Sequence, residues 1–396
     1  MTAARLVART VRGLEQVVAE EVRPLGPVEF QGHREVWFRA QPTPAVLGLR
    51  CADDVLLHGI SVRGVGPARA DLPVLAEAAA RMPLAELLMA RKRCGGKDFT
   101  GGVDVSASFL GRRNYNRYDL EDAVGRPVAS ALGLPYWSRR GGVAPPDGGL
   151  SWRVTVEGDR ALVALRIGER PLHRRGYRRV TRAGSLHPPV AAAMARLGGG
   201  GRVLDPCCGA GTLAVEAALG GAEVVLGLDR DAGAVAAARV NGAAAGLGSG
   251  GAGIDPGIGS GTGAGIDPGV GGRIGAGLGP GVGGRTGAGV GPGLGSGIGA
   301  GIGWGVADAG RLPVADGSID LVLCNPPWDR QVPPTGVLAR RPQHFWRELR
   351  RVLRPGGRAV LLLPANALPR AGFQLLDRLP ISLSGQHPEI VTVRRD

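Results

Sequence analysis

The chain has 396 residues, 44% of them hydrophobic, which is enough for two or three domains with buried cores. Its five cysteines form no C-x-x-C pair and no apolar run reaches the ~18 residues of a membrane span, which argues against a disulfide framework, a metal site and a membrane anchor and predicts a cytoplasmic protein. The net charge of +14 favours a polyanionic partner, either nucleic acid or an anionic membrane surface, although a GC-rich genome explains arginine in place of lysine.

Residues 1–170 predict a mixed α+β region of short elements. The predicted strands are 4–11, 35–40, 101–110 and two segments within 150–167 that a Glu-Gly-Asp turn joins. Apolar side chains at helical spacing predict helices over 13–26 and 120–134. No single motif in this region decides a function.

After a basic connector at 173–182 the pattern changes. Fully apolar strands alternate with helices from residue 201 onward, which predicts a parallel sheet covered on both faces. From residue 251 this pattern is interrupted by a glycine-rich repeat of twelve residues, beginning "GAGIDPGIGSGT". Single apolar residues between glycines bury little surface, so we expect a looped-out, mostly disordered insertion over 244–303; a β-helix or a selected interaction linker is the alternative.

Four predicted strands of the second half end in a polar side chain. These ends are Asp205 in "VLDPCCGAGTLA", Asp229 in "VVLGLD", Asp308 in "VADAGRLP" and Asn325 in "LCNPPW". Ligands bind beyond the carboxyl ends of strands in an open α/β sheet, so the four residues together predict one pocket. The glycine turn after Asp205 alone also fits a dinucleotide fingerprint, and Asp231 is predicted to cap the following helix.

The segment "DPCCGAGT" resembles motif I of class I S-adenosylmethionine-dependent methyltransferases, and "NPPW" resembles the N-P-P-[YFW] motif of enzymes that methylate planar amino nitrogens. The resemblance implies an α/β, Rossmann-like, mostly parallel seven-stranded sheet that "SLSGQHPEIVTVRR" closes as part of an antiparallel pair. It implies S-adenosyl-L-methionine as cofactor, with Asp205 at its amino group, Asp229 at the ribose and Asp308 at the adenine. The implied cofactor-binding residues are Asp205, Cys208, Gly209, Gly211, Thr212, Asp229, Asp308 and Ala309.

The stiff stretch "NPPW" suits an exocyclic amine on a nucleobase. The side-chain oxygen of Asn325 and the carbonyl of Pro326 can accept the two N–H bonds of the amine as it attacks a methyl group. Proline has a fixed φ, so Pro326 and Pro327 orient these acceptors, and Trp328 offers a stacking face for an extruded base. The predicted catalytic residues are Asn325, Pro326, Pro327 and Trp328. Asp329 stands where relatives often have glycine, and the resemblance does not explain it.

The N-terminal "ARLVARTVRGLEQVVAEEVRPLG" resembles the ferredoxin-like module that precedes a THUMP domain, and "LHRRGYR" resembles the connector of tRNA and 23S rRNA guanine-N2 methyltransferases. The predicted domains are a ferredoxin-like module (1–65), a THUMP-like RNA-binding domain (66–170), a basic linker (171–188) and a methyltransferase domain (189–396). The predicted activity is methylation of guanosine N2 by a monomer, with tRNA the favoured substrate. Alternatives are 23S rRNA, DNA adenine, protein glutamine, a dinucleotide oxidoreductase, and an RNA-binding protein whose catalytic half the repeat disables.

Arginine and aromatic residues mix in "RRNYNRY", which suits contacts to an RNA backbone and its bases. A solvated loop, and interdomain salt bridges for the connector arginines, explain the same residues. The predicted RNA-binding residues are Arg112, Arg113, Tyr115, Arg117, Arg174, Arg175 and Arg178. The six histidines are scattered and are predicted to be structural.

Overall fold

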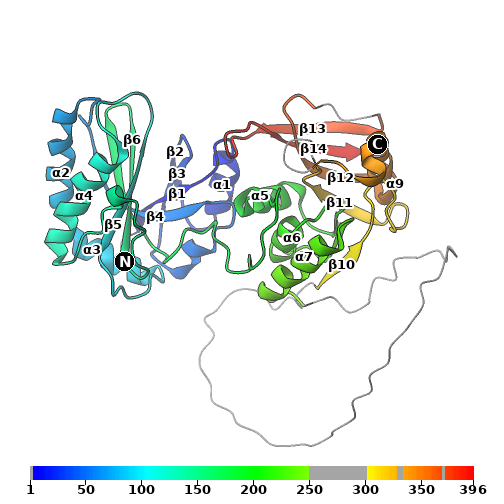
Figure 1. Cartoon of the computed structure of the whole chain (residues 1–396), viewed down its shortest axis with the longest axis horizontal. Coiled ribbons are helices and arrows are strands. Elements are labelled where there is room, and N and C mark those ends of the chain that lie inside the picture. The colour runs from blue at the N-terminus through cyan, green and yellow to red at the C-terminus, as the bar shows by residue number, and fades with distance from the viewer. Residues whose placement is uncertain (1–2, 249–300, 328–332, 368–370) are drawn as a thin grey trace, which may run out of the picture.

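The computed structural model describes residues 3–248, 301–327, 333–367 and 371–396. Two halves, each built on a seven-stranded sheet, follow one another along the long axis of the molecule (Figure 1). Within the described ranges, no helix is both long and apolar enough to cross a membrane. No three His, Cys, Asp or Glu side chains of these ranges gather as the ligands of a metal ion would.

The N-terminal half is one continuous sheet with the strand order β2-β3-β1-β4-β7-β6-β5. Its strands are β1 (Ala4–Arg9), β2 (Val28–Gly32), β3 (Glu35–Ala40), β4 (Asp54–Val62), β5 (Val103–Phe109), β6 (Leu150–Glu157) and β7 (Arg160–Arg166). β5 and β6 are parallel, and the other pairs are antiparallel. β4 of the first predicted module pairs with β7 of the second, so one sheet spans the predicted boundary at residue 65, and the division into two modules stays a prediction.

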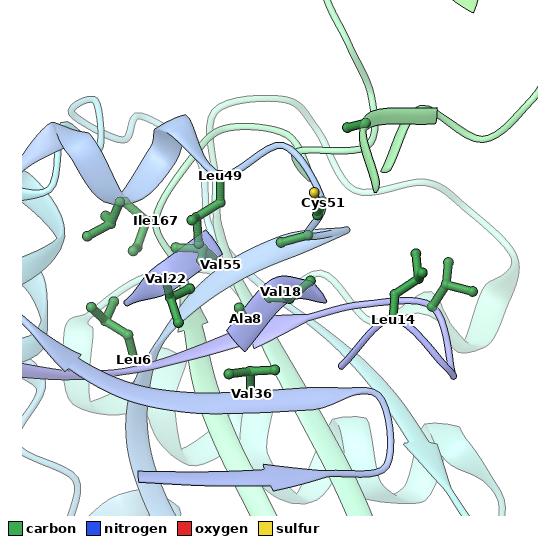
Figure 2. Packing of buried hydrophobic residues seen from close by; sticks show 14 of the residues in the cluster. Leu6, Ala8, Leu14, Val18, Val22, Val36, Leu49, Cys51, Val55 and Ile167 are labelled. Carbon is green, nitrogen blue, oxygen red and sulfur yellow. The ribbon is translucent and has the colours of Figure 1, made fainter. Parts of the chain in front are cut away.

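The helices of this half cover one face of the sheet. Leu6 and Ala8 of β1 belong to the large core that packs under them, whereas Val7 lies in a small cluster with Trp37, as the twofold period of a strand requires. Figure 2 shows α1 packing over the strands with Val18 directed toward them. Each aliphatic side chain buried in this way contributes about 1.5–3 kcal/mol. The helices are α1 (Glu15–Val22), α2 (Leu72–Ala80), α3 (Leu84–Arg93) and α4 (Arg117–Leu132), with 3-10 turns at Pro44–Gly48, Arg69–Asp71 and Arg139–Gly141.

The C-terminal half is a doubly wound sheet with the strand order β10-β9-β8-β11-β12-β14-β13. Its strands are β8 (Arg202–Asp205), β9 (Val224–Asp229), β10 (Ile302–Val306), β11 (Ile319–Cys324), β12 (Leu353–Leu363), β13 (Phe373–Pro380) and β14 (Glu389–Arg395). β10 to β12 run parallel, and β14 is antiparallel to both neighbours. The predicted closing pair is therefore confirmed as β13 and β14, with "SLSGQH" in the turn that joins them.

Helices cover both faces of this second sheet, as its apolar strands predict. Val203 and Leu321 belong to the core that contains the side chains of α5 and α6. Leu204 and Val322, the next residues along the same strands, belong to the core that contains α9. The helices are α5 (Pro188–Gly198), α6 (Thr212–Leu219), α7 (Ala232–Ala244), α8 (Gly336–Arg340) and α9 (Gln343–Val352).

The repeat lies between α7 and β10. The backbone N–H of Ile302 donates to the carbonyl of Gly248 at 3.2 Å, so the chain leaves and re-enters the fold at adjoining points. β10 pairs in register with β9 along its whole length, so the third strand forms despite the repeat. The last two residues of the insertion predicted at 244–303 belong to this strand. The disorder predicted for the repeat itself concerns residues 249–300, which lie outside the described ranges.

Trp304 ties β10 to the rest of the sheet. Its indole fills a slot bordered by three glycines from three elements. A Cβ atom at Gly211 would lie 2.8 Å from the ring and one at Gly242 3.2 Å from it, while one at Gly227 would overlap it. One large side chain therefore locks together the glycine turn before α6, strand β9 and helix α7.

Candidate active site

The four polar strand ends lie at one edge of the sheet. Asp229 and Asp205 are the last residues of β9 and β8, Asn325 follows β11 directly, and Asp308 lies two residues beyond β10. These four strands are consecutive neighbours, and the chain order reverses between β8 and β11. The sheet therefore brings the predicted residues to its topological switch point, where doubly wound folds bind their ligands.

Asp229 organises the glycine turn that follows β8. Its Oδ2 accepts a hydrogen bond from the N–H of Gly209 at 2.9 Å, and its Oδ1 accepts one from the N–H of Asp231 at 2.9 Å. Each carboxylate oxygen can accept two hydrogen bonds, so the group keeps capacity for two ribose hydroxyls. As predicted, the Asp231 side chain caps α7, accepting from the N–H of Gly233 at 2.7 Å.

The two glycines of the turn have different tasks. Both have positive φ, 52° at Gly209 and 81° at Gly211, which disfavours other residues. A Cβ at Gly211 would meet Trp304 and Ala238, so this glycine serves close packing inside the protein. A Cβ at Gly209 would meet nothing within 4 Å, so this glycine leaves open space beside the backbone. A ligand can approach the turn at Gly209.

Asp205 is 1% exposed, and its Oδ1 accepts a single backbone N–H, from Cys207 at 3.2 Å. Burial, reinforced by the charge of Asp229, raises the pKa of Asp205 well above its usual range. A ligand ammonium group would relieve the cost of ionising this carboxyl. Thr212, the first residue of α6, is buried beside the turn.

The cysteines of this region are poor nucleophiles. Cys208 and Cys324 are buried, and burial raises the pKa of both thiols well above the ordinary value. A thiol that stays protonated does not attack carbon readily. The site therefore favours direct transfer between bound molecules over a route through a covalent cysteine intermediate.

Asp308 holds the segment that begins α8. Its Oδ1 accepts from the N–H of Gly310 at 2.8 Å and its Oδ2 from the N–H of Val337 at 3.0 Å, and Arg230 lies 3.7 Å from the carboxylate. Ala309 is buried next to it. Sequence reasoning missed the contact with Val337, because it joins segments that are 29 residues apart in the chain.

Asn325 is held by the connector between the two halves. Its Nδ2 donates to the backbone carbonyl of Gly184 at 3.4 Å, and its Oδ1 accepts no hydrogen bond from the described residues. Pro326 is buried and Pro327 is partly buried. Trp328, predicted as a stacking face, lies outside the described residues, as does Asp329.

Three of the predicted RNA-binding residues have partners elsewhere in the fold, and a fourth, Arg117, donates to the hydroxyl of its neighbour Tyr118 at 2.8 Å. Arg113 donates to the carbonyls of Val65 and Gly66 at 3.1 and 2.9 Å, and the hydroxyl of the buried Tyr115 also donates to Gly66. Arg175 belongs to an interdomain cluster on Glu216, the alternative explanation for the connector arginines. Arg112, Arg117 and Arg174 are exposed and Arg178 is partly buried, so these four stay predictions as RNA contacts.

Asn241 of α7 is a residue that sequence reasoning missed. Its Nδ2 donates to the carbonyls of Val180 and Ala210 at 2.9 and 2.8 Å, and its Oδ1 accepts from the N–H groups of Arg179 and Val180 at 2.9 and 3.0 Å. The side chain is 1% exposed and fully hydrogen bonded. It joins the connector to the glycine turn, a role that only the tertiary structure reveals.

The C-terminal half is similar to known methyltransferase domains. Residues 175–252 match the family model "RMKL-like, methyltransferase domain", and residues 293–361 match a general methyltransferase domain model. Parts of the C-terminal half of this chain are thus similar to an RMKL-like methyltransferase domain and to a general methyltransferase domain. The predicted class I fold and methyltransferase activity are thereby confirmed.

Some matches extend over nearly the whole chain, so the similarity includes the N-terminal half as well as the methyltransferase domain. The tRNA (guanine(6)-N2)-methyltransferase of Thermus thermophilus is 28% identical over 98% of this chain and 99% of its own. The crystal structure of TrmN from Thermus thermophilus matches with a TM-score of 0.69 over 99% of both chains. The ribosomal RNA large subunit methyltransferase K/L of Photobacterium profundum is 32% identical over 57% of this chain, which spans only 30% of that protein.

S-adenosylmethionine is the cofactor of the methyltransferase domain. The residues present fit it: Gly209 leaves open space beside its backbone, and three carboxylates lie at the same edge of the sheet. We expect Asp205 to hold its amino group, Asp229 its ribose and Asp308 its adenine amine. When bound, the cofactor supplies an electrophilic methyl group, and the side chains around it orient the acceptor and exclude water.

Proposed function

We propose that this protein methylates the exocyclic N2 amine of a guanosine in tRNA. The observation that carries the proposal is Asn325, whose amide oxygen accepts no hydrogen bond from the described residues and lies at the same sheet edge as the acidic strand ends, while the connector holds its nitrogen. The full-length similarity to a tRNA guanine-N2 methyltransferase supports the same substrate. A net charge of +14 suits a polyanionic RNA.

The chemistry follows from the weak nucleophilicity of a conjugated amine. As the nitrogen attacks, positive charge develops on it and its two N–H bonds become stronger donors. Oδ1 of Asn325 and the carbonyl of Pro326 accept these bonds, and the preorganised backbone avoids reorganisation at that moment. Bound S-adenosylmethionine would supply the methyl group, while Asn325 and Pro326 would hold the amine that accepts it and loses one proton to solvent.

The test compares purified native protein with Asn325→Ala and with Gln343→Ala, an exposed control on α9. Labelled cofactor is supplied with tRNA, and nucleosides are analysed by mass spectrometry. Loss of one transition-state acceptor should lower kcat by ~10²-fold, while affinity for S-adenosylhomocysteine is kept. A fully active Asn325→Ala enzyme would show that the mechanism is wrong.

The other candidate substrate is 23S rRNA, because a ribosomal RNA large subunit methyltransferase K/L matches 57% of the chain. Parallel reactions with tRNA, 23S rRNA, duplex DNA and a glutamine peptide decide between the substrates. Methylation of rRNA alone would overturn the choice of tRNA. We infer that the reaction takes place in the cytoplasm, since the five cysteines are free thiols.

A further inference from the structure

A second candidate binding site lies in the N-terminal half, at the outer edge of β5. A cavity of about 290 Å³ is lined there by side chains of β5, β6 and the start of α4, together with the loop around Val143. β5 is the last strand in the sheet order; at this edge Val103 bonds to Pro135 and Trp137, and no further strand of the described ranges pairs with β5 there. The volume is at the small end for ligand pockets and suits a single nucleotide-sized molecule.

Glu121 of α4 leaves one oxygen without a partner in this cavity. The residue is 2% exposed, and its Oε1 accepts the N–H of Ala107 on the edge strand at 3.0 Å. Its Oε2 is buried and receives no hydrogen bond within the described part of the chain. A buried polar atom without a partner costs stability, and Oε2 is placed to accept a hydrogen bond from a ligand N–H or O–H group.

Arg153 of β6 supplies a positive charge on the other side of the same cavity. Its guanidinium donates to the hydroxyls of Ser106 and Ser108 at 3.4 and 2.7 Å. Within the described ranges it forms no salt bridge, in contrast to Arg139 beside it, which pairs with Asp104 at 2.5 Å. Burial, with the nearby charges of other arginines, lowers the pKa of Arg153 to about 10. A desolvated guanidinium of this kind favours an anion.

We propose that this cavity binds a nucleotide, with its phosphate on Arg153 and a ribose hydroxyl or base N–H donating to Glu121. An anion alone would leave Glu121 unsatisfied, and a neutral donor alone would leave Arg153 unsatisfied. A nucleotide carries both groups in one molecule. Arg117, which also lines the cavity, adds a second cation at its mouth. The site is separate from the methyl-transfer site, so the proposal stands or falls independently of the proposed function.

The experiment measures binding to the full-length protein by calorimetry at fixed salt. The probes are inorganic phosphate, the four nucleoside 5′-monophosphates and a mixed-sequence RNA octamer. The variants are Arg153→Gln and Glu121→Gln, with Arg126→Gln as control, since Arg126 is an exposed cation of the same helix α4. Arg153→Gln should weaken phosphate and nucleotides at least tenfold, and Glu121→Gln should weaken nucleotides but not phosphate. Arg126→Gln should change neither.

The RNA octamer identifies the source of the nucleotide. If the octamer binds more tightly than any monophosphate and loses more affinity in Arg153→Gln than in Arg126→Gln, the occupant is a unit of an RNA chain. If monophosphates bind as well as the octamer, the occupant is a free nucleotide. Equal binding by all three variants, or no binding of any probe at millimolar concentration, overturns the proposal.

A fold-independent measurement covers the case in which Arg153→Gln does not fold. Hydrogen exchange of native protein is then recorded with and without a saturating monophosphate. Binding at the cavity should slow exchange in peptides from β5 and the first turn of α4, and leave α9 unchanged. Unchanged exchange over β5 and α4 overturns the proposal without reference to any variant.

Discussion

Arg175 of the connector donates through Nε to Oε1 of Glu216 at 3.0 Å, and so fastens the N-terminal half to the helix that follows motif I. Arg50 and the hydroxyl of Tyr177 donate to the same carboxylate. The Glu216 side chain has no exposed surface. Two cations and a hydroxyl thus converge on one buried acid between the halves.

We expect Glu216→Ala to destabilise the protein by about 3–5 kcal/mol, because it leaves two partly buried guanidinium groups without a counter-charge. Chemical denaturation measures the loss. Glu223→Ala, an exposed acid after the same helix, is the control and should stay within about 0.5 kcal/mol of the native protein. An unchanged denaturation midpoint in Glu216→Ala would show that the cluster around this carboxylate does not stabilise the protein.

Asn241→Leu should weaken cofactor binding as well as stability. The substitution leaves two carbonyls and two N–H groups of the connector and the glycine turn without partners, each at a cost of about 1–3 kcal/mol. Calorimetry with S-adenosylhomocysteine measures the affinity, and denaturation measures stability. If stability falls while affinity is unchanged, the amide does not position the glycine turn.

Trp304 and Gly227 should behave as a coupled pair. Trp304→Ala empties the indole slot and should cost about 3–5 kcal/mol. Gly227→Ala should be severely destabilising in the native background, because its Cβ overlaps the ring. In a Trp304→Leu background the same change should cost less, and a double-mutant cycle measures the difference. Additive effects would contradict the close contact.

Deleting residues 251–298 should leave methyl transfer intact. The ends of the insertion already adjoin, and shortening a loop from roughly 50 to 5 residues relieves about 2 kcal/mol of closure entropy. The thermal midpoint should therefore rise slightly, with equal kcat in both proteins. Activity found only in the deletion variant would instead identify the natural protein as a pseudoenzyme.

His58 makes the N-terminal half sensitive to acid. Burial, with the charges of Arg5 and Arg160, lowers the pKa of His58 to about 4, against about 6.5 in an unfolded chain. The unfolded state therefore binds a proton that the folded state does not, and stability falls as the pH drops from about 6.5 toward 4. We expect the unfolding free energy of His58→Gln to fall less over this range.

Denaturation curves at several pH values test the role of His58. His387→Gln, which replaces an exposed histidine, is the control and should follow the native pH dependence. If the unfolding free energies of His58→Gln and the native protein fall equally with pH, His58 is not the source of the acid sensitivity.

The sequence was most informative about the position of the site, because a single rule about parallel strands determines it. Asp205, Asp229, Asp308 and Asn325 could be placed at one edge of the sheet, because parallel strands present their carboxyl ends at one edge. The rule needs only the strand order along the chain. It says nothing about which backbone groups each carboxylate holds, so the contact of Asp308 with Val337 emerged only from the structure.

Orientation and long-range partners were beyond the sequence. "RRNYNRY" has the composition of an RNA-binding loop, yet Arg113 and Tyr115 point inward and hold the loop to Gly66. Local composition does not determine which way a side chain faces. Glu216 likewise looks like an ordinary helix residue, and its partners come from segments far away in the chain.

The hydrogen bond between Gly248 and Ile302 holds the two ends of the insertion together, so this position can accept an inserted domain; we call it the insertion socket. A guest domain whose own termini lie close together could be spliced in there without straining either half. A fluorescent or affinity module placed at this socket would report on the enzyme from inside the catalytic half and leave both chain ends unmodified. The gene itself has room to lengthen at this point with little effect on the fold that surrounds it.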